Sequence, residues 1–418
     1  MSNFRGSLQN YLKCDACGAV ITTRTAVGHG TYQEFAFPCT ECGIEIRFGM
    51  DIDQEKHSFQ YTKIINAKWT KALCSSSEMD FSAESTVVLD SESLIPILGE
   101  FFSPFMATTF LPKDPEQFRL AQSRRFSFTQ NIWPMIEKLI IHEGNRNKEL
   151  YDAQKSELGY QDECHTWKDR ILLTLRILEK YGRVFRPTHR KSDDLIRQRI
   201  NLSDVASPNL IRDLIRYLNT TGKTTDLFLE IISIRKRWAY LYPMLSPIYN
   251  IFYWSEEGNS LDIYTLAEKR FEDLKPFFVD CFETLCRISL IASAIEGIIW
   301  CKSLVVPTSK KPMRLQKFDE MPNGSKPDIL RNMVIGDLFV PYMDNKLRNG
   351  IGHHSARYDV NNDAIEYSYK TKKGTQLEII SYIRFCEKVV RLYVQIELLS
   401  IYVHWVTAKA EGIKGKIV

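Results

Sequence analysis

The chain has 418 residues, of which 44% are hydrophobic and 25% are charged, with 55 lysines and arginines against 51 aspartates and glutamates. This length and apolar content predict two or three globular domains and exclude a disordered tail. The net charge of +4 is too small to indicate a polyanion partner by itself, so any nucleic-acid interpretation depends on local patches.

The first residues lack the apolar segment of a signal peptide, and the most apolar later stretch, residues 289–307, is interrupted by Glu296 and Lys302. Four of the ten cysteines cluster near the N-terminus, and the other six are scattered through apolar or helix-like surroundings. Scattered free thiols are typical of a reducing compartment. We therefore expect a soluble, cytoplasmic protein that does not use a membrane.

Two matched Cys-x-x-Cys hooks, each followed by a glycine, dominate residues 1–55. They supply Cys14, Cys17, Cys39 and Cys42. Two cysteines three apart on a tight turn can reach one tetrahedral ion, and four thiolates fill its shell, leaving no position for a catalytic water. We predict a small β zinc ribbon with a structural Zn²⁺. Whether the ribbon also binds nucleic acid or a partner protein stays open, whereas a redox role is disfavoured because no βαβ pattern surrounds the hooks.

The middle region, residues 56–222, changes character along its length. Residues 56–116 mix short β-like runs with polar clusters, and their pattern predicts no particular fold. From residue 117 the pattern is helical: apolar residues recur at spacings of three and four from Trp167 to Leu178, before Gly182, and again from Leu227 to Leu241, before Pro243. Such stripes predict helices that pack against one another in a core.

Basic residues gather in two places and suggest contacts with RNA. One group comprises Arg183, Arg186, Arg190 and Lys191, and the other comprises Lys370, Lys372 and Lys373, close to three tyrosines. Cations grip phosphates, and aromatic rings stack on unpaired bases. The alternative interpretation is that the first group is a solvated loop and that the tyrosines form a cross-strand pair on a surface hairpin.

Near the C-terminus the sequence contains Arg348 and Asn349 followed by His353, an Arg-Asn-x-x-x-His motif. Pro341 is well placed to open a helix, and apolar residues from Leu338 to Ile351 supply its buried side. The motif should therefore lie on a helix, or at its end, inside a bundle.

Two further elements are predicted after the motif. Residues 356–360 and 364–369 form a β-hairpin that turns at residues 361–363. Thr375 and Glu378 are spaced as a capping box that starts a long last helix, with Ile379, Ile383 and further apolar residues along one side. The predicted fold class is mainly α: a β zinc ribbon, a helical middle region, and a C-terminal helical bundle over residues 223–418 with a hairpin insertion.

This C-terminal part resembles the HEPN superfamily, whose four-helix bundles carry an Arg-x4-6-His motif with a polar residue after the arginine. The resemblance covers roughly residues 224–412, and Arg348, Asn349 and His353 match all three elements of the motif. It implies a metal-independent endoribonuclease of an antiphage-defence or toxin system, in which two bundles pair so that both motifs face one cleft. A homodimer, RNA, and an inhibitor or trigger protein are the partners that follow.

The residue types suit that chemistry. RNA cleavage without a metal needs a group with a near-neutral pKa to take a proton from the 2′-hydroxyl, which suits His353, and a cation to stabilise the phosphate, which suits Arg348. Asn349 lies four residues before His353 and can orient the imidazole or the phosphate. Arg348 is five residues away, about 140° around an ideal helix, so a second protomer could complete the site.

Three other residues are candidates for support. His354 is a possible second titrating group or substrate contact, Glu296 is a lone acid in an apolar run, and Tyr358 is a tyrosine close to the motif. In the opposing interpretation Arg348 pairs with Asp344 on a surface helix and His353 caps the helix C-terminus. The protein is then a non-catalytic nucleic-acid-binding or scaffold protein that recognises through its ribbon and dimerises through its bundle.

Overall fold

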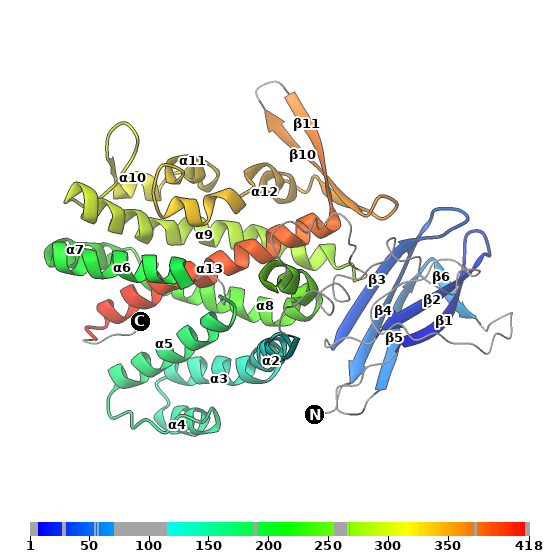
Figure 1. Ribbon diagram of the computed structural model, residues 1–418, viewed down its shortest axis with the longest axis horizontal. Helices are drawn as coiled ribbons and strands as arrows, with labels where there is room; N and C mark the ends of the chain where they lie inside the picture. Colours follow the sequence, from blue (N-terminus) through cyan, green and yellow to red (C-terminus); the bar gives the residue numbers. More distant parts are fainter. Residues whose placement is uncertain are drawn as a thin grey trace. The chain divides into compact units, whose positions relative to one another are not determined.

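The computed structural model describes residues 7–26, 31–53, 56, 58–70, 115–186, 190–254, 266, 268–371 and 374–413 (Figure 1). Helices account for 61% of the residues that the structure describes, and small β-sheets lie near the N-terminus. The chain is therefore mainly α, which confirms the predicted fold class. Cys74 and most of the segment 56–116, for which we predicted no fold, lie outside the described residues.

The chain divides into two compact units, each drawn from three separate segments. The ribbon unit takes Met1–Ala121, Leu241–Pro276 and Asn349–Val390, and the helical unit takes Gln122–Tyr240, Phe277–Arg348 and Arg391–Val418. Both differ from the continuous segments 1–55, 56–222 and 223–418 that we predicted. The reason is that long helices run from one unit into the other, so neither unit is contiguous in sequence.

In the N-terminal part of the ribbon unit, the described residues form six strands. They are β1 (Ser7–Cys14), β2 (Val20–Ala26), β3 (Tyr32–Pro38), β4 (Glu45–Asp53), β5 (Ser58–Ile65) and β6 (Ala67–Thr70). They make two antiparallel sheets, ordered β2-β1-β6 and β3-β4-β5, which share one core centred on Phe48. The ring of Phe48 contacts those of Phe35, Tyr61 and Trp69. The β structure therefore continues past residue 55 to Thr70.

A third antiparallel sheet lies in the ribbon unit, with strand order β11-β10-β9. The predicted hairpin is confirmed as β9 (Ala356–Asp359) and β10 (Ala364–Thr371). The capping box is wrong, because Thr375 and Glu378 belong to strand β11 (Gly374–Ser381), which pairs with β10. Gly374, the first residue of β11, has a φ of 113°, which glycine adopts without strain, and the last helix starts only at Tyr382.

Helices make up the helical unit and several of them continue into the ribbon unit. They are α2 (Pro115–Phe126), the π-helical η1 (Ser127–Ile132), α3 (Trp133–Gly144), α4 (Lys148–Glu157), α5 (Trp167–Val184), α6 (Arg190–Ala206), α7 (Pro208–Thr220), α8 (Lys223–Trp254), α9 (Phe271–Cys301), α10 (Leu315–Asp319), α11 (Lys326–Leu330), α12 (Asn345–Gly352) and α13 (Tyr382–Ala410). Short 3-10 turns η3 (Asn323–Ser325), η4 (Gly336–Leu338) and η5 (Val340–Tyr342) and the two-stranded pair β7 (Val305–Val306) and β8 (Met313–Arg314) connect them.

Helix α8 does not end at Pro243 as we expected but continues through Pro243 and Pro247. A proline leaves the carbonyl four residues earlier without its helical donor. Here the carbonyl of Ala239 accepts from the Gln130 amide at 2.9 Å, and that of Pro243 accepts from the Ser246 hydroxyl at 3.0 Å. Both carbonyls thus have other donors, and the helix persists.

Gly182, expected to mark the end of a helix, lies inside the last turn of α5. A Cβ at this position would lie 2.7 Å from a carboxylate oxygen of Glu397, so the glycine permits close packing against α13. Pro341 likewise lies in η5, and α12 starts at Asn345, where the Asp344 carboxylate accepts from the backbone of Leu347 at 3.0 Å. Asp344 therefore acts as the helix cap.

Among the helices that the structure describes, α9 and α13 are long and apolar enough to cross a membrane by length and composition alone. Their most apolar windows are 78% and 94% buried inside the protein, and helices in the core of a soluble protein meet the same criterion. This is weak support for a membrane span.

Candidate functional site

The four predicted zinc cysteines come together in the ribbon unit. The two hooks have the same backbone turn: the amides of Gly18 and Gly43 donate to the carbonyls of Cys14 and Cys39, and both glycines have a positive φ. Each hook closes one hairpin, β1–β2 or β3–β4, so the shared core brings the hooks together. All four sulfurs lie within 4.8 Å of one another, in a cluster that could hold a metal ion.

The sulfur separations suit a tetrahedral ion. Cys14 and Cys42 have sulfurs 3.8 Å apart, and those of Cys17 and Cys39 are 3.6 Å apart. An ion with four sulfurs at about 2.3 Å spaces them about 3.8 Å from each other. Sequence spacing thus placed these residues correctly.

The thiols also influence one another's ionisation. The backbone amide of Cys17 is the main cause that lowers the pKa of Cys14 to about 7. The pKa of Cys17, although the amide of Ala19 lowers it, is raised overall to about 12 by desolvation and by the sulfurs of Cys42 and Cys39. Ionisation of one thiol therefore opposes ionisation of the neighbouring thiols. A cation at the centre of the cluster would allow all four to ionise.

A cavity of about 440 Å³ lies at the C-terminal end of α12, within the ribbon unit. It is lined by Asn349, His353, Ser355, Ser368, Tyr369, Lys370 and Thr375. His353 is exposed, and its imidazole makes no hydrogen bond to any other residue that the structure describes. The cavity thus combines an imidazole, an exposed ammonium, an aromatic residue and three hydroxyl-bearing residues.

Two contacts fix the end of α12 against β10. Gly350 allows close approach, since a Cβ there would lie 2.9 Å from the Cβ of Tyr367. The hydroxyl of Ser355 contacts the carbonyl oxygens of Gly350 at 2.9 Å and Ser368 at 2.7 Å. Together these contacts place His353 beside the strand that carries Lys370.

The tyrosines of β10 are held by a carboxylate of β11. Tyr367 and Tyr369 each donate a hydrogen bond of 2.7 Å to Glu378. Lys370, the next residue, is exposed, whereas Lys372 and Lys373 lie outside the described residues. Of the predicted cations in this group, Lys370 is the one that the structure places in the cavity wall.

Arg348 precedes Asn349 in α12 and belongs to the helical unit, where it forms an ion pair with Glu283. Its Nε donates to the Glu283 carboxylate at 2.7 Å, its Nη2 contacts the same oxygen, and Glu283 also accepts from Asn323. The side chains of Arg348 and Glu283 are 28% and 17% exposed. The guanidinium is therefore a paired, partly exposed cation.

The candidate supporting residues have separate surroundings. Glu296 is buried in the helical unit, where it accepts from the Trp300 indole at 2.7 Å and lies 3.5 Å from Arg199. Tyr358, in the ribbon unit, donates to Asp363 at 2.8 Å, and burial is the main cause that raises its pKa. His354 is exposed with a φ of 57° and does not line the cavity.

In the basic group of the middle region, Arg183 and Arg186 are engaged in ion pairs. Arg186 is buried and bonds to Glu179 and Asp193, each at 2.8 Å, while Arg183 contacts the same Glu179 oxygen at 3.3 Å. This burial is at odds with an RNA contact by Arg186, which has a structural role. Arg183 is 59% exposed, and the side chains of Arg190 and Lys191 lie outside the described part of the chain.

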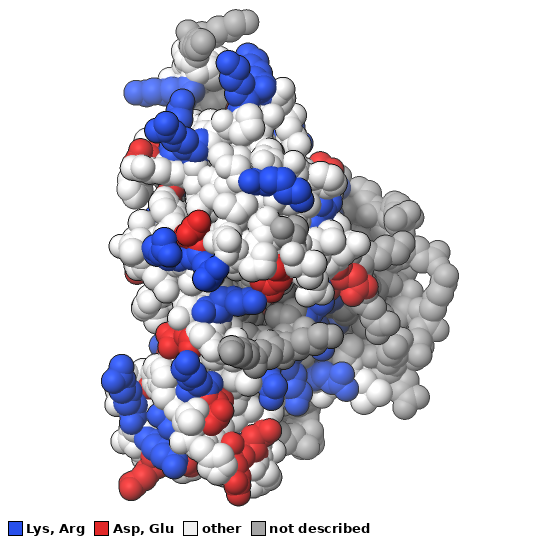
Figure 2. Space-filling view, turned by 90° about the vertical axis from the view of Figure 1, so that its left-hand side faces the viewer, with Lys and Arg blue, Asp and Glu red and all other residues white. Residues whose placement is uncertain are grey.

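One face of the molecule shows how the exposed charges are distributed. Figure 2 shows lysines and arginines spread over this face with aspartates and glutamates between them. The described residues visible there therefore mix both signs, which does not single out this face as a phosphate-binding surface.

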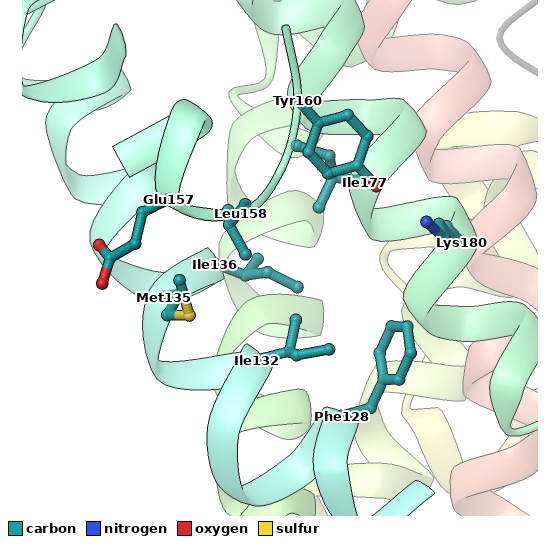
Figure 3. A pocket seen from close by; sticks show the side chains of 9 residues that line it. All are labelled: Phe128, Ile132, Met135, Ile136, Glu157, Leu158, Tyr160, Ile177 and Lys180. Carbon is teal, nitrogen blue, oxygen red and sulfur yellow. The ribbon is translucent and has the colours of Figure 1, made fainter. Parts of the chain in front are cut away.

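A second cavity, of about 250 Å³, lies in the helical unit among η1, α3, α5 and the chain after α4 (Figure 3). Phe128, Ile132 and Ile136 converge on it, whereas the carboxylate of Glu157 is turned away. Its walls are mainly apolar and include no imidazole. Of these two cavities, the one around His353 carries a side chain able to exchange a proton near neutral pH.

Sequence reasoning missed four residues at these sites. Ser355, Ser368 and Thr375 line the cavity, and Glu283 holds Arg348 from 65 positions earlier in the chain. Glu283 is an acid within the apolar stripe of α9, a signal that we assigned to Glu296 instead. The three hydroxyl-bearing residues carry no local pattern that separates them from other serines and threonines.

Comparisons of this chain with protein-family models, with curated proteins and with solved structures give no match. Its chemistry therefore has to be inferred from its own residues.

Proposed function

We propose that this protein is a metal-independent endoribonuclease that cleaves RNA by attack of a 2′-hydroxyl on the adjacent phosphate. The observation that supports the proposal is the cavity in which the exposed imidazole of His353 shares the walls with Lys370 and Tyr369. An imidazole can exchange a proton, a cation can bind a phosphate, and an aromatic ring can stack on a base.

In the proposed reaction His353 accepts the proton of the 2′-hydroxyl. The bond from the 2′-oxygen to phosphorus forms as the bond from phosphorus to the 5′-oxygen breaks, and the leaving oxygen takes a proton from water or from a protonated imidazole. The products are a 2′,3′-cyclic phosphate and a 5′-hydroxyl. Lys370 stabilises the negative charge that builds on the phosphate.

The resemblance of the motif to that of HEPN enzymes supports roles for Asn349 and Arg348 in the proposed reaction. Asn349 lines the cavity and orients the imidazole or the phosphate. Arg348 supplies a guanidinium for the phosphate, and Glu283 fixes its plane. The same resemblance supports a homodimer and a role as a toxin or antiphage effector, restrained or triggered by another protein.

We further propose that the four-cysteine cluster binds a structural Zn²⁺ and that the protein acts in the cytoplasm. Four thiolates would fill the shell of the ion, so it would hold the two hooks together without activating water. All nine cysteines in the described part of the chain are free, which suits a reducing compartment. Metal analysis should give one zinc per chain, lost in Cys14→Ser/Cys17→Ser, and a metal-free wild-type protein would contradict this assignment.

A second candidate function is a non-catalytic nucleic-acid-binding or scaffold protein. It is favoured by one observation, the ion pair between Arg348 and Glu283, because a carboxylate partner reduces the positive charge that Arg348 offers to a phosphate. RNA binding without cleavage, surviving Arg348→Ala but lost when Cys14 and Cys17 are replaced, would support this function.

The ribonuclease proposal is tested with purified protein and RNA in a buffer freed of divalent ions by a chelating resin, with zinc content measured afterwards. We expect fragments with 2′,3′-cyclic phosphate ends and no cut at a 2′-deoxy position. His353→Ala should slow cleavage by about a hundredfold or more, and Arg348→Ala should also reduce it. The matched control is His354→Asn, because His354 is a neighbouring exposed imidazole and asparagine tolerates its positive φ. Equal cleavage by wild type and His353→Ala would sink the assignment.

A further inference from the structure

Strand β11 forms one edge of the sheet β11-β10-β9 (Figure 1). Over its eight residues, Gly374–Ser381, it pairs with β10 and with no other strand in the described part of the chain. Its outer side therefore presents a row of backbone N–H and C=O groups. An uncovered edge of this length is a template for pairing with another strand.

The side chains of β11 do not protect this edge. Leu377 and Ile379 are 67% and 63% exposed, and as alternate residues of a strand they lie on the same face. Edge strands are usually guarded by charges or proline, yet Glu378 is the one charged residue of β11 and its carboxylate is bonded to Tyr367 and Tyr369. The edge is thus both apolar and open.

The order of residues in β11 suits pairing with itself. In an antiparallel pair centred on Leu377, that residue faces Leu377 of the second copy, Thr375 faces Ile379, and Gln376 faces Glu378. The Leu377 pair lies on the two-fold axis, the other two contacts each occur twice, and no carboxylate faces another. We propose that β11 pairs antiparallel with β11 of a second copy of this chain, joining two three-stranded sheets into one of six strands.

This surface differs from the helical bundle that we considered for dimerisation from the sequence. An eight-residue edge buries less than the roughly 1,200 Å² of a standard stable interface, so the dimer should be weak and reversible. Thr375 of β11 also lines the cavity around His353, so the second copy would lie next to the proposed active site. That consequence rests on the proposed function, whereas the dimer itself does not.

The test is sedimentation of the full chain over a concentration series up to about 100 µM. The wild-type mass should rise from 48.6 kDa towards twice that value. Leu377→Lys/Ile379→Lys should raise the dimer dissociation constant by at least about tenfold, because two ammonium groups at position 377 would face one another across the axis and the apolar contact of Ile379 would be lost. The control, Leu229→Lys/Val334→Lys, adds the same charge at residues that are 54% and 45% exposed and should behave as wild type.

Both double variants change exposed side chains, and circular dichroism checks that each is folded. A wild-type chain that stays monomeric throughout the series would overturn the proposal. So would a dimer that the β11 variant leaves intact, or one that the control weakens equally, because either result places the interface elsewhere. Since the readout is mass and not cleavage, the outcome does not depend on whether the protein cleaves RNA.

Discussion

Two polar regions of the molecule use charged residues in opposite ways. In the helical unit Arg235 and Glu397 are completely buried and joined by two hydrogen bonds of 2.9 and 2.7 Å, and Arg186 is held among carboxylates. In the ribbon unit the imidazole of His353 is exposed in a cavity without a hydrogen-bond partner among the described residues.

This difference separates structural from functional polar residues. A buried charge must be paired, so its donors are already occupied and are costly to release. An exposed imidazole without a partner contributes little to stability and can exchange a proton with a substrate. Sequence charge alone does not distinguish the two, since Arg186 and Lys370 were both candidates for RNA contacts.

The largest effect is expected from breaking the buried pair. Glu397→Ala should lower the free energy of unfolding by about 3–5 kcal/mol, because it leaves Arg235 buried without its partner. Urea denaturation measures this change. Lys236→Ala is the control: Lys236 is 62% exposed and pairs with Glu137, so its loss should cost about 1 kcal/mol or less. Equal effects of the two variants would show that the buried pair is not the stabilising element.

Glu268 is an intermediate case: its side chain is 13% exposed, and it is poorly paired. Desolvation raises its pKa to about 8, and the carboxylates of Glu34 and Asp273 add to the rise, against the effect of Arg270, whose Nη1 lies 3.8 Å away. Because the folded state holds this proton more tightly than the unfolded state, Glu268 destabilises the protein progressively as pH rises from about 4.5 to 8.

Glu268→Gln should therefore reduce the fall in melting temperature between pH 5 and pH 8. Glu272→Gln removes a carboxylate that is 68% exposed and controls for the loss of one negative charge. A wild-type slope retained in Glu268→Gln would mean that Glu268 is ionised in the folded protein throughout this range.

The sequence predicted those features that local patterns determine. Cysteine spacing located the four-cysteine cluster, and apolar periodicity located α5 and the buried side of α13. The hairpin β9–β10 was also found, because its turn residues and alternating strands are adjacent in sequence. Each of these features is encoded within a short segment.

Features that depend on distant residues were not predicted. Thr375 and Glu378 have the spacing of a helix cap, yet they lie in a strand. That strand is stabilised by its pairing with β10 and by the hydrogen bonds of two tyrosines to Glu378. Helix α8 passes Pro243 because Gln130, 109 positions away from Ala239, supplies the missing donor. Glu283 holds Arg348 in the same long-range way. The spacing of residues within one segment gives no information about partners that are distant in the sequence.

The contact between α12 and β10 can be tested with two glycines of the same helix. Gly350→Ala should destabilise the protein by about 1–3 kcal/mol, because its Cβ would lie 2.9 Å from that of Tyr367 and the side chain there cannot move freely. Gly352→Ala, with nothing within 4 Å of its Cβ, should be neutral or stabilising by up to about 1 kcal/mol. If both substitutions are neutral, the cavity does not depend on close packing of α12, and the position of His353 is less fixed than we infer.

The smallest effect is expected at Lys370, where the proposed phosphate contact can be tested by RNA binding, without a cleavage assay. Lys370→Ala should leave stability within about 0.5 kcal/mol of wild type. It should weaken RNA binding and lower the slope of log affinity against log salt by about 1, since one cation no longer displaces a counterion. Arg357→Ala is matched to it, because Arg357 is an exposed cation of the same sheet that pairs with Glu366 and does not line the cavity. Identical salt slopes for wild type and Lys370→Ala would remove Lys370 from the phosphate site, and His353 would then have to act beside a different cation.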